Sequence, residues 1–526
     1  MPGMEQTLGR IEAVRGAQVT AILEHDATEL GDAIRIGALV KIAAPGSTVV
    51  ATVSAVEEAD GTPPRQSIVA DLLGELTGDG VFARGVAHYP LPGAAVSAAS
   101  PADLDAVYAR PTSFHVRIGS LHHDPARTAF LLTDELLAKH FAVLGTTGSG
   151  KSCAVTLILR SVLAQHPNAH IVLLDPHNEY EQAFGAMAEI VNIDNLQLPF
   201  WLLDNEEAVA TLVSGGSLLE QQSQATILKD AITQARRKFA GDLNAQWITV
   251  DTPVPYRTGD LVHILDEAMG KLDKPDSSAP YMRLKSRIES MNGDRRFAFM
   301  FSRVVTRDIL NTVLGRLLRI PVGGRPVTII DLSGVPSEIV NVVVSLLCRI
   351  AFDFALWADR DQMPPLLLVC EEAHRYVPSD ERVGFAATTR AISRIAKEGR
   401  KYGVSLGLVT QRPSELAVSA LSQCGTIFAL RMGNELDQRF VANVLPEAAH
   451  GMVGALPAMR PQEAIIVGEG VPLPIRVRFD ELAPGERPRS RSAEFSKSWQ
   501  QDGAGNDFLE DGIKRWRMQM RKHELG

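Results

Sequence analysis

The segment Phe141-Ala142-Val143-Leu144-Gly145-Thr146-Thr147-Gly148-Ser149-Gly150-Lys151-Ser152 carries the strongest structural signal in the chain. Four apolar residues, typical of a buried strand, run directly into the pattern G-x-x-x-x-G-K-[ST]. An apolar helical segment, Cys153 to Leu163, follows it. Strand, loop and helix in this order are the context that a phosphate-binding loop requires. We therefore predict a nucleoside triphosphate site at a helix N-terminus.

Each residue type in this loop suits a role in holding phosphates. Glycines let backbone N–H groups curl around a phosphate at the positive end of a helix. Lys151 would neutralise phosphate oxygens, and the Ser152 hydroxyl is a hard oxygen ligand for Mg²⁺. We predict ATP and Mg²⁺ as cofactors, with the nucleotide bound by Gly145, Thr146, Thr147, Gly148, Ser149, Gly150, Lys151, Ser152 and Cys153.

A second acidic element follows the apolar run Leu366 to Cys370, which ends in Glu371 and Glu372. We assign Glu371 the metal-side role usually held by Asp, and Glu372 the role of a general base that polarises the attacking water. Glu is one methylene longer than Asp, so the sequence leaves open whether Glu371 contacts the metal directly or through water. Two solvated acids at a strand end are the alternative.

Val404 to Thr410 is another apolar run, and it ends at Gln411. An amide side chain both donates and accepts hydrogen bonds, so Gln411 could sense the γ-phosphate from the end of a strand beside the acidic pair. The alternative is that Gln411 caps the turn at Arg412-Pro413-Ser414.

Asp175 ends the apolar run His170 to Leu174. Parallel sheets place chemistry beyond the carboxyl ends of their strands, so Asp175 and Glu179 are expected to face the nucleotide. An Asp before Pro is also a common turn opener. His177 lacks neighbouring ligands, so a solvated or hydrogen-bonded histidine is favoured over a metal ligand.

The remaining pattern divides the 526 residues into further units. Short apolar runs between Gly and Pro turn signals predict a β-barrel over residues 1–110. Alternating strands and helices over 111–204 and 320–480 predict an α/β core with a parallel sheet covered by helices. Residues 205–319 read as an inserted helical subdomain, and 481–526 as a tail with a short helix.

Composition narrows the functional class. Hydrophobic residues make up 45% of the chain, which is typical of a globular protein, and the net charge of −9 confines nucleic-acid contact to local basic patches. The N-terminal segment does not resemble a signal peptide, and charges break the longest apolar run, so no membrane segment is predicted. A reducing, cytoplasmic location fits four cysteines without CxxC spacing: Cys153, Cys348, Cys370 and Cys424.

Taken together, Gly145 to Ser152, Asp175 to Tyr180, Cys370 to Arg375 and Thr410 to Ser414 resemble the HerA family of the HerA/FtsK translocase superfamily in order and spacing. The resemblance covers most of residues 5–480. It implies a RecA-like P-loop NTPase core behind a β-barrel of the HAS-barrel type. It also implies a homohexameric ring that hydrolyses ATP between subunits and pumps double-stranded DNA, commonly with a NurA-like nuclease. Glu371 in place of Asp and Asn178 in place of Gly depart from the family pattern.

The resemblance also implies an arginine finger donated by a neighbouring subunit, and Arg400 is the best position for it. A guanidinium at the γ-phosphate stabilises charge that develops in the transition state. The alternative is that Arg400 belongs to a solvated helix face with Arg394, Lys397 and Lys401.

Candidate DNA contacts are basic clusters in the insertion, although solvated surface is the alternative for each. Without interleaved aromatic residues, they favour duplex backbone contact over single-strand binding. The clusters are Arg283, Lys285, Arg287, Arg295 and Arg296, and Arg236, Arg237 and Lys238. The basic end from Lys514 to Lys522 could pack on a neighbouring subunit or a partner, or be a mobile end.

Three functions remain open on the sequence. The first is an ATP-driven DNA translocase or helicase that acts in DNA repair or antiphage defence. The second is a nucleotide-gated scaffold that activates an effector, such as a nuclease or a sirtuin-type NADase. The third is a protein-remodelling ATPase, which would respond to unfolded protein and not to DNA.

Overall fold

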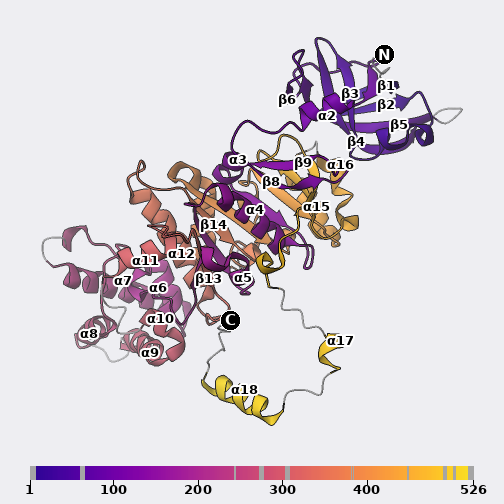
Figure 1. Ribbon diagram of the computed structural model, residues 1–526. Coiled ribbons are helices and arrows are strands. Elements are labelled where there is room, and N and C mark those ends of the chain that lie inside the picture. The colour runs from indigo at the N-terminus through magenta and orange to yellow at the C-terminus, as the bar shows by residue number, and fades with distance from the viewer. Residues whose placement is uncertain are drawn as a thin grey trace. The chain divides into compact units, whose positions relative to one another are not determined.

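The computed structural model describes residues 7–59, 65–241, 245–271, 278–301, 308–380, 382, 384–446, 449–489, 495–500 and 505–518. The chain forms two compact units, Met1–Pro488 and Arg489–Gly526. The second unit contains helices α17 (Phe495–Ser498) and α18 (Asn506–Met518). Figure 1 shows the elements of both units.

A closed six-stranded antiparallel barrel forms the N-terminal part of the first unit (Figure 1). Its strand order is β2-β1-β7-β3-β4-β5, and pairing of β2 with β5 closes it. Strand β6 (Phe82–Arg84) pairs antiparallel with the last residues of β5. Gly9 is required on β1 because a Cβ there would lie 2.1 Å from the Ile22 carbonyl oxygen. The barrel strands are β1 (Thr7–Arg15), β2 (Gln18–Leu23), β3 (Leu39–Ala44), β4 (Ser47–Ala59), β5 (Arg65–Leu76) and β7 (Ala95–Ala98).

An eleven-stranded mixed sheet forms the core among the described residues, in the order β12-β13-β11-β14-β15-β10-β16-β17-β18-β8-β9. Strands β12 to β16 of this order are parallel, and the remaining pairings are antiparallel. The strands are β8 (His115–Leu121), β9 (Thr128–Leu132), β10 (Phe141–Leu144), β11 (His170–Asp175), β12 (Ala188–Val191), β13 (Val327–Asp331), β14 (Leu366–Cys370), β15 (Val404–Thr410), β16 (Thr426–Leu430), β17 (Glu463–Gly468) and β18 (Ile475–Phe479).

Helices cover both faces of the parallel strands, and two hydrophobic clusters fill the space between them. Strands β10, β14 and β15 are buried along their whole length, as expected of a parallel sheet covered on both sides. The helices of this part are α3 (Thr133–Ala138), α4 (Lys151–Gln165), α5 (Glu181–Phe184), α12 (Val340–Trp357), α13 (Ala386–Glu398), α14 (Val418–Leu421), α15 (Glu435–Val444) and α16 (His450–Val453). Two short helices, α1 (Ala27–Leu30) and α2 (Pro101–Val107), lie in the N-terminal region.

Helix α12 is long and apolar enough to cross a membrane by length and composition. Its buried residues include Val343, Leu346 and Phe352, and they belong to the same hydrophobic cluster as Leu368 of β14 and Leu406 of β15. The helix is therefore a core element of the α/β domain, since its apolar side chains already pack within the protein.

The predicted helical insertion is present between β12 and β13. Leu228, Ile232 and Ala235 are buried at the predicted helical spacing, whereas Phe239 is half exposed. Its helices are α6 (Asn205–Leu212), α7 (Leu218–Ala240), α8 (Thr258–Met269), α9 (Ala279–Gly293), α10 (Ala298–Phe301) and α11 (Leu310–Leu318). The fold is thus the predicted α/β P-loop core with an N-terminal barrel and an inserted helical subdomain.

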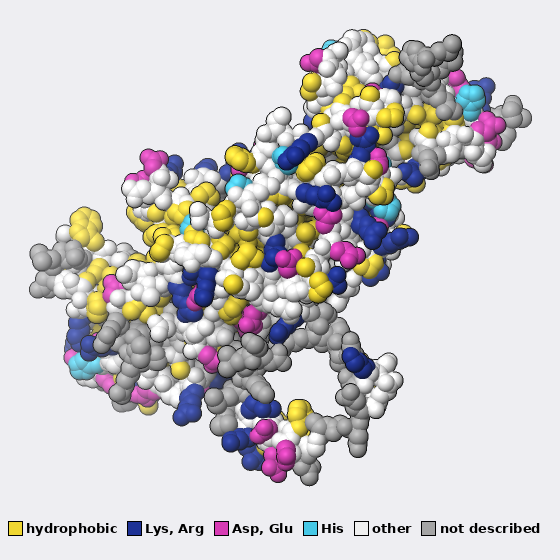
Figure 2. Space-filling model, viewed as in Figure 1, with side chains coloured by type: hydrophobic (Ala, Val, Ile, Leu, Met, Phe, Trp, Pro, Cys, Tyr) yellow, Lys and Arg dark blue, Asp and Glu magenta, His cyan; other side chains and the backbone are white. Residues whose placement is uncertain are grey.

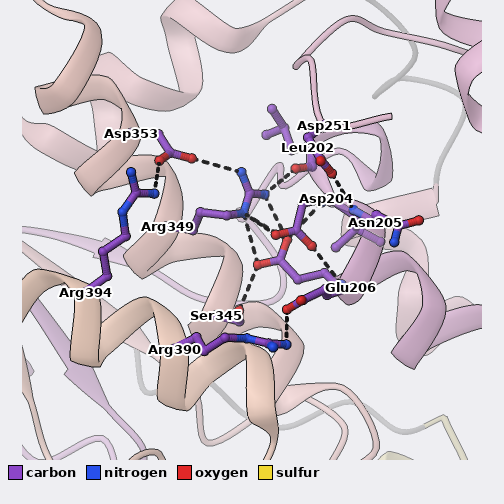
Figure 3. Close-up of polar contacts among 12 residues, drawn as sticks. Leu202, Asp204, Asn205, Glu206, Asp251, Ser345, Arg349, Asp353, Arg390 and Arg394 are labelled. Atoms are coloured by element: carbon purple, nitrogen blue, oxygen red, sulfur yellow. Dashed lines mark hydrogen bonds and ion pairs between the residues drawn. The ribbon is translucent and has the colours of Figure 1, made fainter. Parts of the chain in front are cut away.

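A buried ionic network joins the insertion to the core (Figure 3). The Arg349 guanidinium on α12 lies 2.8 Å from Glu207 Oε2 on α6 and 3.3 Å from Asp204 Oδ2. Ser345, one helical turn before Arg349, donates to Glu207 Oε1 at 2.8 Å. Glu207 has no exposed surface, so its charge depends on these partners.

We expect Glu207→Ala to destabilise the folded protein by about 3–5 kcal/mol, because it leaves Arg349 buried without its main counter-charge. The free energy of unfolding from denaturant titration measures this loss. Glu206→Ala is the matched control. The Glu206 carboxylate pairs with Arg390 at the surface, so its removal should lower the free energy of unfolding far less. Equal losses in the two variants would contradict this role for the network.

Candidate active site

The phosphate-binding loop lies between β10 and α4, as its motif predicts. Gly148 and Gly150 have φ values of 75° and 101°, a region that glycine adopts readily. The loop is anchored from behind: the Thr146 N–H and hydroxyl both donate to the Arg431 carbonyl, at 3.1 and 3.0 Å. This conformation turns the loop around the N-terminus of α4, where backbone N–H groups and the helix dipole attract phosphate.

Lys151 is largely buried beside this loop. Its ammonium donates to the Thr146 carbonyl, with 3.2 Å between nitrogen and oxygen. Burial lowers the pKa of Lys151, and three carboxylates oppose that shift: Glu371, Glu372 and Glu179. The acidic pair after β14 and the loop after β11 therefore converge on the same lysine, although more than two hundred residues separate Lys151 from Glu371 in the chain.

The loop after β11 brings a carboxylate to Ser152, the predicted metal ligand. The Ser152 hydroxyl donates to Glu179 Oε2 at 2.7 Å. Asp175, which is 1% exposed, accepts from the backbone N–H groups of Glu179 at 2.8 Å, Tyr180 at 3.0 Å and His177 at 3.2 Å. Burial raises the pKa of Asp175 to about 6. Asp175 thus shapes the loop that carries Glu179, and Glu179 is the residue of the two that contacts the phosphate-binding loop.

The acidic pair after β14 is buried, with Glu371 6% and Glu372 7% exposed. The Tyr180 hydroxyl donates to Glu371 Oε1, and the Glu372 N–H donates to Glu371 Oε2 at 3.3 Å. Burial raises the pKa of Glu371 to about 7, against the opposing effects of the Tyr180 hydrogen bond and the Lys151 charge. The alternative of two solvated acids is therefore wrong.

Glu372 has a left-handed backbone, with φ of 53° and ψ of 43°. Such a conformation costs a non-glycine residue about 1–3 kcal/mol and is common at functional sites. Its Oε1 lies 3.6 Å from His177 Nε2, and its buried Oε2 lies 3.3 Å from His374 Nδ1, a contact that lacks hydrogen-bond geometry. A carboxylate oxygen in this state can accept a hydrogen bond from a water.

Gln411 lies against the phosphate-binding loop, since the Thr147 hydroxyl donates to Gln411 Oε1. The turn that follows is held instead by Thr410, whose hydroxyl accepts from the Arg412 N–H at 3.0 Å. Strand β15 pairs with both β10 and β14, so its carboxyl end falls between the loop and the acidic pair. This position favours the sensing role over the turn-capping alternative.

Arg400 lies at the opposite edge of the sheet. It is exposed in the turn Gly399–Tyr402 before β15, and the seven residues of that strand separate it from Gln411 by about 23 Å. It borders an apolar cleft of about 680 Å³ lined by Leu137, Val162 and Pro167. Arg400 cannot reach the phosphate-binding loop of its own chain.

The site has the donor set that Mg²⁺ requires at a P-loop. No group of three or more His, Cys, Asp or Glu side chains in the described part of the chain forms a metal cage. Mg²⁺ bound with a nucleotide takes one or two protein carboxylates and fills its remaining positions with hydroxyl, phosphate and water oxygens. The oxygens of Ser152, Glu179 and Glu371 fit that requirement.

Sequence reasoning missed two side chains of the site, His374 and Tyr180. His374 contacts both Glu372 and the Thr410 hydroxyl, which lies 2.9 Å from Nδ1. Tyr180 follows Glu179 directly and has no exposed surface. The signal in the sequence was its position directly after a predicted site residue. That position alone does not show that Tyr180 is buried or which carboxylate it contacts.

The expectation that Arg236 contacts DNA is wrong. Its side chain is buried and donates to the Trp201 and Leu203 carbonyls, both at 2.9 Å, and to the Thr252 carbonyl. It lies over the Tyr256 ring, 5.6 Å from the centroid. Arg236 holds the insertion together, because its donors satisfy backbone acceptors that have no water available.

Other basic residues of the insertion are paired with acids at its surface. The pairs are Lys238 with Asp260, Arg283 with Glu220, Lys285 with Asp266, Arg287 with Glu338, and Arg296 with Asp294. On the face drawn in Figure 2, blue and magenta side chains are interspersed and form no continuous basic field. One subunit therefore does not present a strongly cationic surface on this face.

The fold and the site together define a P-loop ATPase with a RecA-like core. Comparison with known proteins agrees: residues 116–351 match the family model described as the central domain of the helicase HerA. Over these residues the chain is similar to the HerA family.

Two relatives illustrate the match. The DNA double-strand break repair helicase HerA of Pyrococcus furiosus is 28% identical over 414 residues, covering 70% of each chain. HerA of Sulfolobus acidocaldarius is 26% identical over 399 residues, covering 75% of this chain and 74% of the relative. The solved structure of VirB4 of Thermoanaerobacter pseudethanolicus superposes with a TM-score of 0.51 at 16% identity, over 72% of this chain and 98% of that chain, and it supports the fold alone.

We expect Gln411→Ala to lower kcat for ATP hydrolysis by roughly 10²-fold, the usual loss when one transition-state hydrogen-bond donor is removed. Nucleotide affinity should change little, because the loop backbone and Lys151 remain. Steady-state kinetics and equilibrium nucleotide binding measure the two effects. Arg412→Ala is the control, since that side chain pairs with Glu415; a similar loss in both variants would contradict a specific role for Gln411.

Proposed function

We propose that this protein is an ATP-driven, hexameric double-stranded DNA translocase or helicase. The main support is that the ATPase site lies at one edge of the sheet, while Arg400 lies at the other edge, about 23 Å from Gln411. A site built in two halves suits a ring in which each subunit completes its neighbour's site. The relatives named DNA double-strand break repair helicases support DNA as the substrate.

Within one subunit, ATP would bind with its phosphates along Gly145 to Ser152 and with Mg²⁺ at Ser152 and Glu371. Lys151 would exchange the Thr146 carbonyl for phosphate oxygens. Glu372 would accept a hydrogen bond from the attacking water through its carboxylate, which lies beside His177 and His374. Gln411, held at the loop by Thr147, would register whether the γ-phosphate is present.

Arg400 of a neighbouring subunit would complete the site. Its guanidinium is exposed and has no ion pair among the described residues, whereas Arg394 of the same segment lies 3.2 Å from Asp353 and stacks 4.6 Å from the Phe352 centroid. Since no ion pair within its own subunit holds this guanidinium, it would be available to a neighbouring subunit. Such fingers contribute about 10³–10⁵-fold to hydrolysis.

DNA would be held by modest positive charge repeated around the ring, because each subunit has a net charge of −9. The cations left for this task are those without carboxylate partners in the described ranges. Arg295 in the insertion and Arg375, exposed just beyond the acidic pair, meet this condition. Six copies of each would converge on one channel and contact phosphates without reading sequence.

Each part of the chain would have its own role in this ring. Residues 111–204 and 320–480 would be the motor, 205–319 would flank it, 1–110 would assist ring assembly and partner docking, and 481–526 would brace a neighbour or partner. The partner would be a NurA-like nuclease or another effector such as a sirtuin-type NADase, in DNA end processing or antiphage defence.

The first test is steady-state ATPase activity of the full-length protein with and without linear duplex DNA, together with its mass in solution. We expect a hexamer whose activity rises with duplex DNA. Lys151→Ala should lose nucleotide binding, and Glu372→Gln should bind nucleotide without hydrolysing it. A ring whose ATPase ignores DNA, or full activity in both variants, would refute the motor proposal.

Mixing two inactive variants tests the trans role of Arg400. Lys151→Ala retains Arg400, and Arg400→Ala retains an intact loop, so mixed rings should regain part of the ATPase activity that neither variant has alone. Lys401→Ala, one residue further, should behave like the wild type. Wild-type activity in Arg400→Ala rings would exclude the finger.

A further inference from the structure

The metal-binding serine is hydrogen-bonded to an unexpected partner. Ser152 Oγ donates to Glu179 Oε2 at 2.7 Å, and Glu179 belongs to the loop after β11, not to the acidic pair after β14. That loop is fixed from below by the buried Asp175 carboxylate, which accepts three of its backbone N–H groups. The position of Glu179 is therefore set by the fold, since the backbone that carries it is held at three points.

Glu371, the acid predicted to lie on the metal side, already accepts hydrogen bonds at both carboxylate oxygens. Glu371 Oε1 accepts from the Tyr180 hydroxyl, and Oε2 accepts from the Glu372 N–H at 3.3 Å. Tyr180 is the residue after Glu179, so one short loop places a carboxylate on Ser152 and a hydroxyl on Glu371. The two acidic roles that metal binding requires are thereby divided between two strands.

A serine hydroxyl that ligates a divalent cation offers an oxygen lone pair to the metal and can still donate its O–H to a hydrogen-bond acceptor. A carboxylate at 2.7 Å is a strong acceptor and fixes the direction of the remaining lone pairs. Partners of this kind change metal affinity by about 10–100-fold when they are removed. One other observation indicates a site prepared for a ligand: Ser149 Oγ in the loop is buried and has no hydrogen-bond partner among the described residues.

We propose that Glu179 is the positioning residue for Mg²⁺ in this ATPase: it orients Ser152 toward the metal, while the Tyr180 hydroxyl and the Glu372 N–H orient Glu371. This inference rests on the proposed ATP- and Mg²⁺-dependent function. Glu179 need not touch the metal; it acts through the serine oxygen. Glu371 stands where the family usually has the shorter Asp. This arrangement accommodates the longer side chain, because the acid after β14 does not have to reach Ser152.

The test measures how much Mg²⁺ strengthens nucleotide binding in the full-length protein without DNA. A fluorescent, non-hydrolysable ATP analogue is titrated in excess Mg²⁺ and again in EDTA, and the ratio of the two Kd values is the readout. Glu179→Gln keeps the side-chain shape but weakens the acceptor. We expect its ratio to fall about 10–100-fold below that of the wild type, while its Kd in EDTA stays within about twofold. Glu181→Gln, two residues further and exposed, is the matched control and should keep the wild-type ratio.

A double-mutant cycle separates this role from general damage to the loop. Because Glu179 acts through Ser152, adding Glu179→Gln to Ser152→Ala should cost no further Mg²⁺ enhancement, whereas independent contributions would add. Direct Mn²⁺ binding in the presence of the analogue, followed by electron paramagnetic resonance, should show the same pattern.

The possible outcomes are distinct. A wild-type ratio in Glu179→Gln, or additive losses in the cycle, overturns the role of Glu179 and leaves the proposed motor intact. No Mg²⁺ enhancement in the wild type overturns both the inference and the metal-dependent function on which it rests. A variant whose Kd in EDTA also weakens by more than tenfold shows that Glu179 supports the loop itself, and this too overturns the proposal.

Discussion

The parallel register of β10, β15, β14 and β11 is the constraint on which the site depends. Leu144 pairs with Thr410, Cys370 with Leu408, and Leu174 with Cys370, so the carboxyl ends of four strands meet at one edge. The segments that follow those ends are the phosphate-binding loop, Gln411, the acidic pair and the Glu179 loop. A slip of one residue would turn alternate side chains to the other face and scatter the site.

That edge concentrates acids around one lysine, and the fold must hold them without bulk water. Hydrogen bonds satisfy most of the carboxylate oxygens: backbone N–H groups serve Asp175, and a tyrosine hydroxyl serves Glu371. Raised pKa values of Asp175 and Glu371 record the cost of their burial. The left-handed backbone of Glu372 adds local strain. These features are unfavourable for stability, and they leave unsatisfied acceptors where a nucleotide, a metal and a water would bind.

The opposite edge of the sheet carries Arg400, whose surroundings differ from those of the acidic residues. Arg400 stands alone at the amino end of β15, whereas its neighbours Arg390 and Arg394 are tied to Glu206 and Asp353. The Arg349 network on α12 connects the same region to the insertion. Basic residues that look alike in the sequence thus have different surroundings. Arg236 is buried within the insertion, Arg390 and Arg394 form ion pairs with Glu206 and Asp353, and Arg400 has no ion pair among the described residues.

We could predict the P-loop, the acidic pair, the α/β core, the barrel and the helical insertion from the amino-acid sequence, because glycine spacing, apolar periodicity and turn residues are local properties of the chain. The folded structure was needed to show that Asp175 shapes a loop, that Glu179 contacts Ser152, that Tyr180 hydrogen-bonds to Glu371 and that Arg236 is buried. Each of these depends on which side chains the sheet order brings together across tens to hundreds of residues, and hydrogen-bond partners at that distance leave no periodic trace in the sequence.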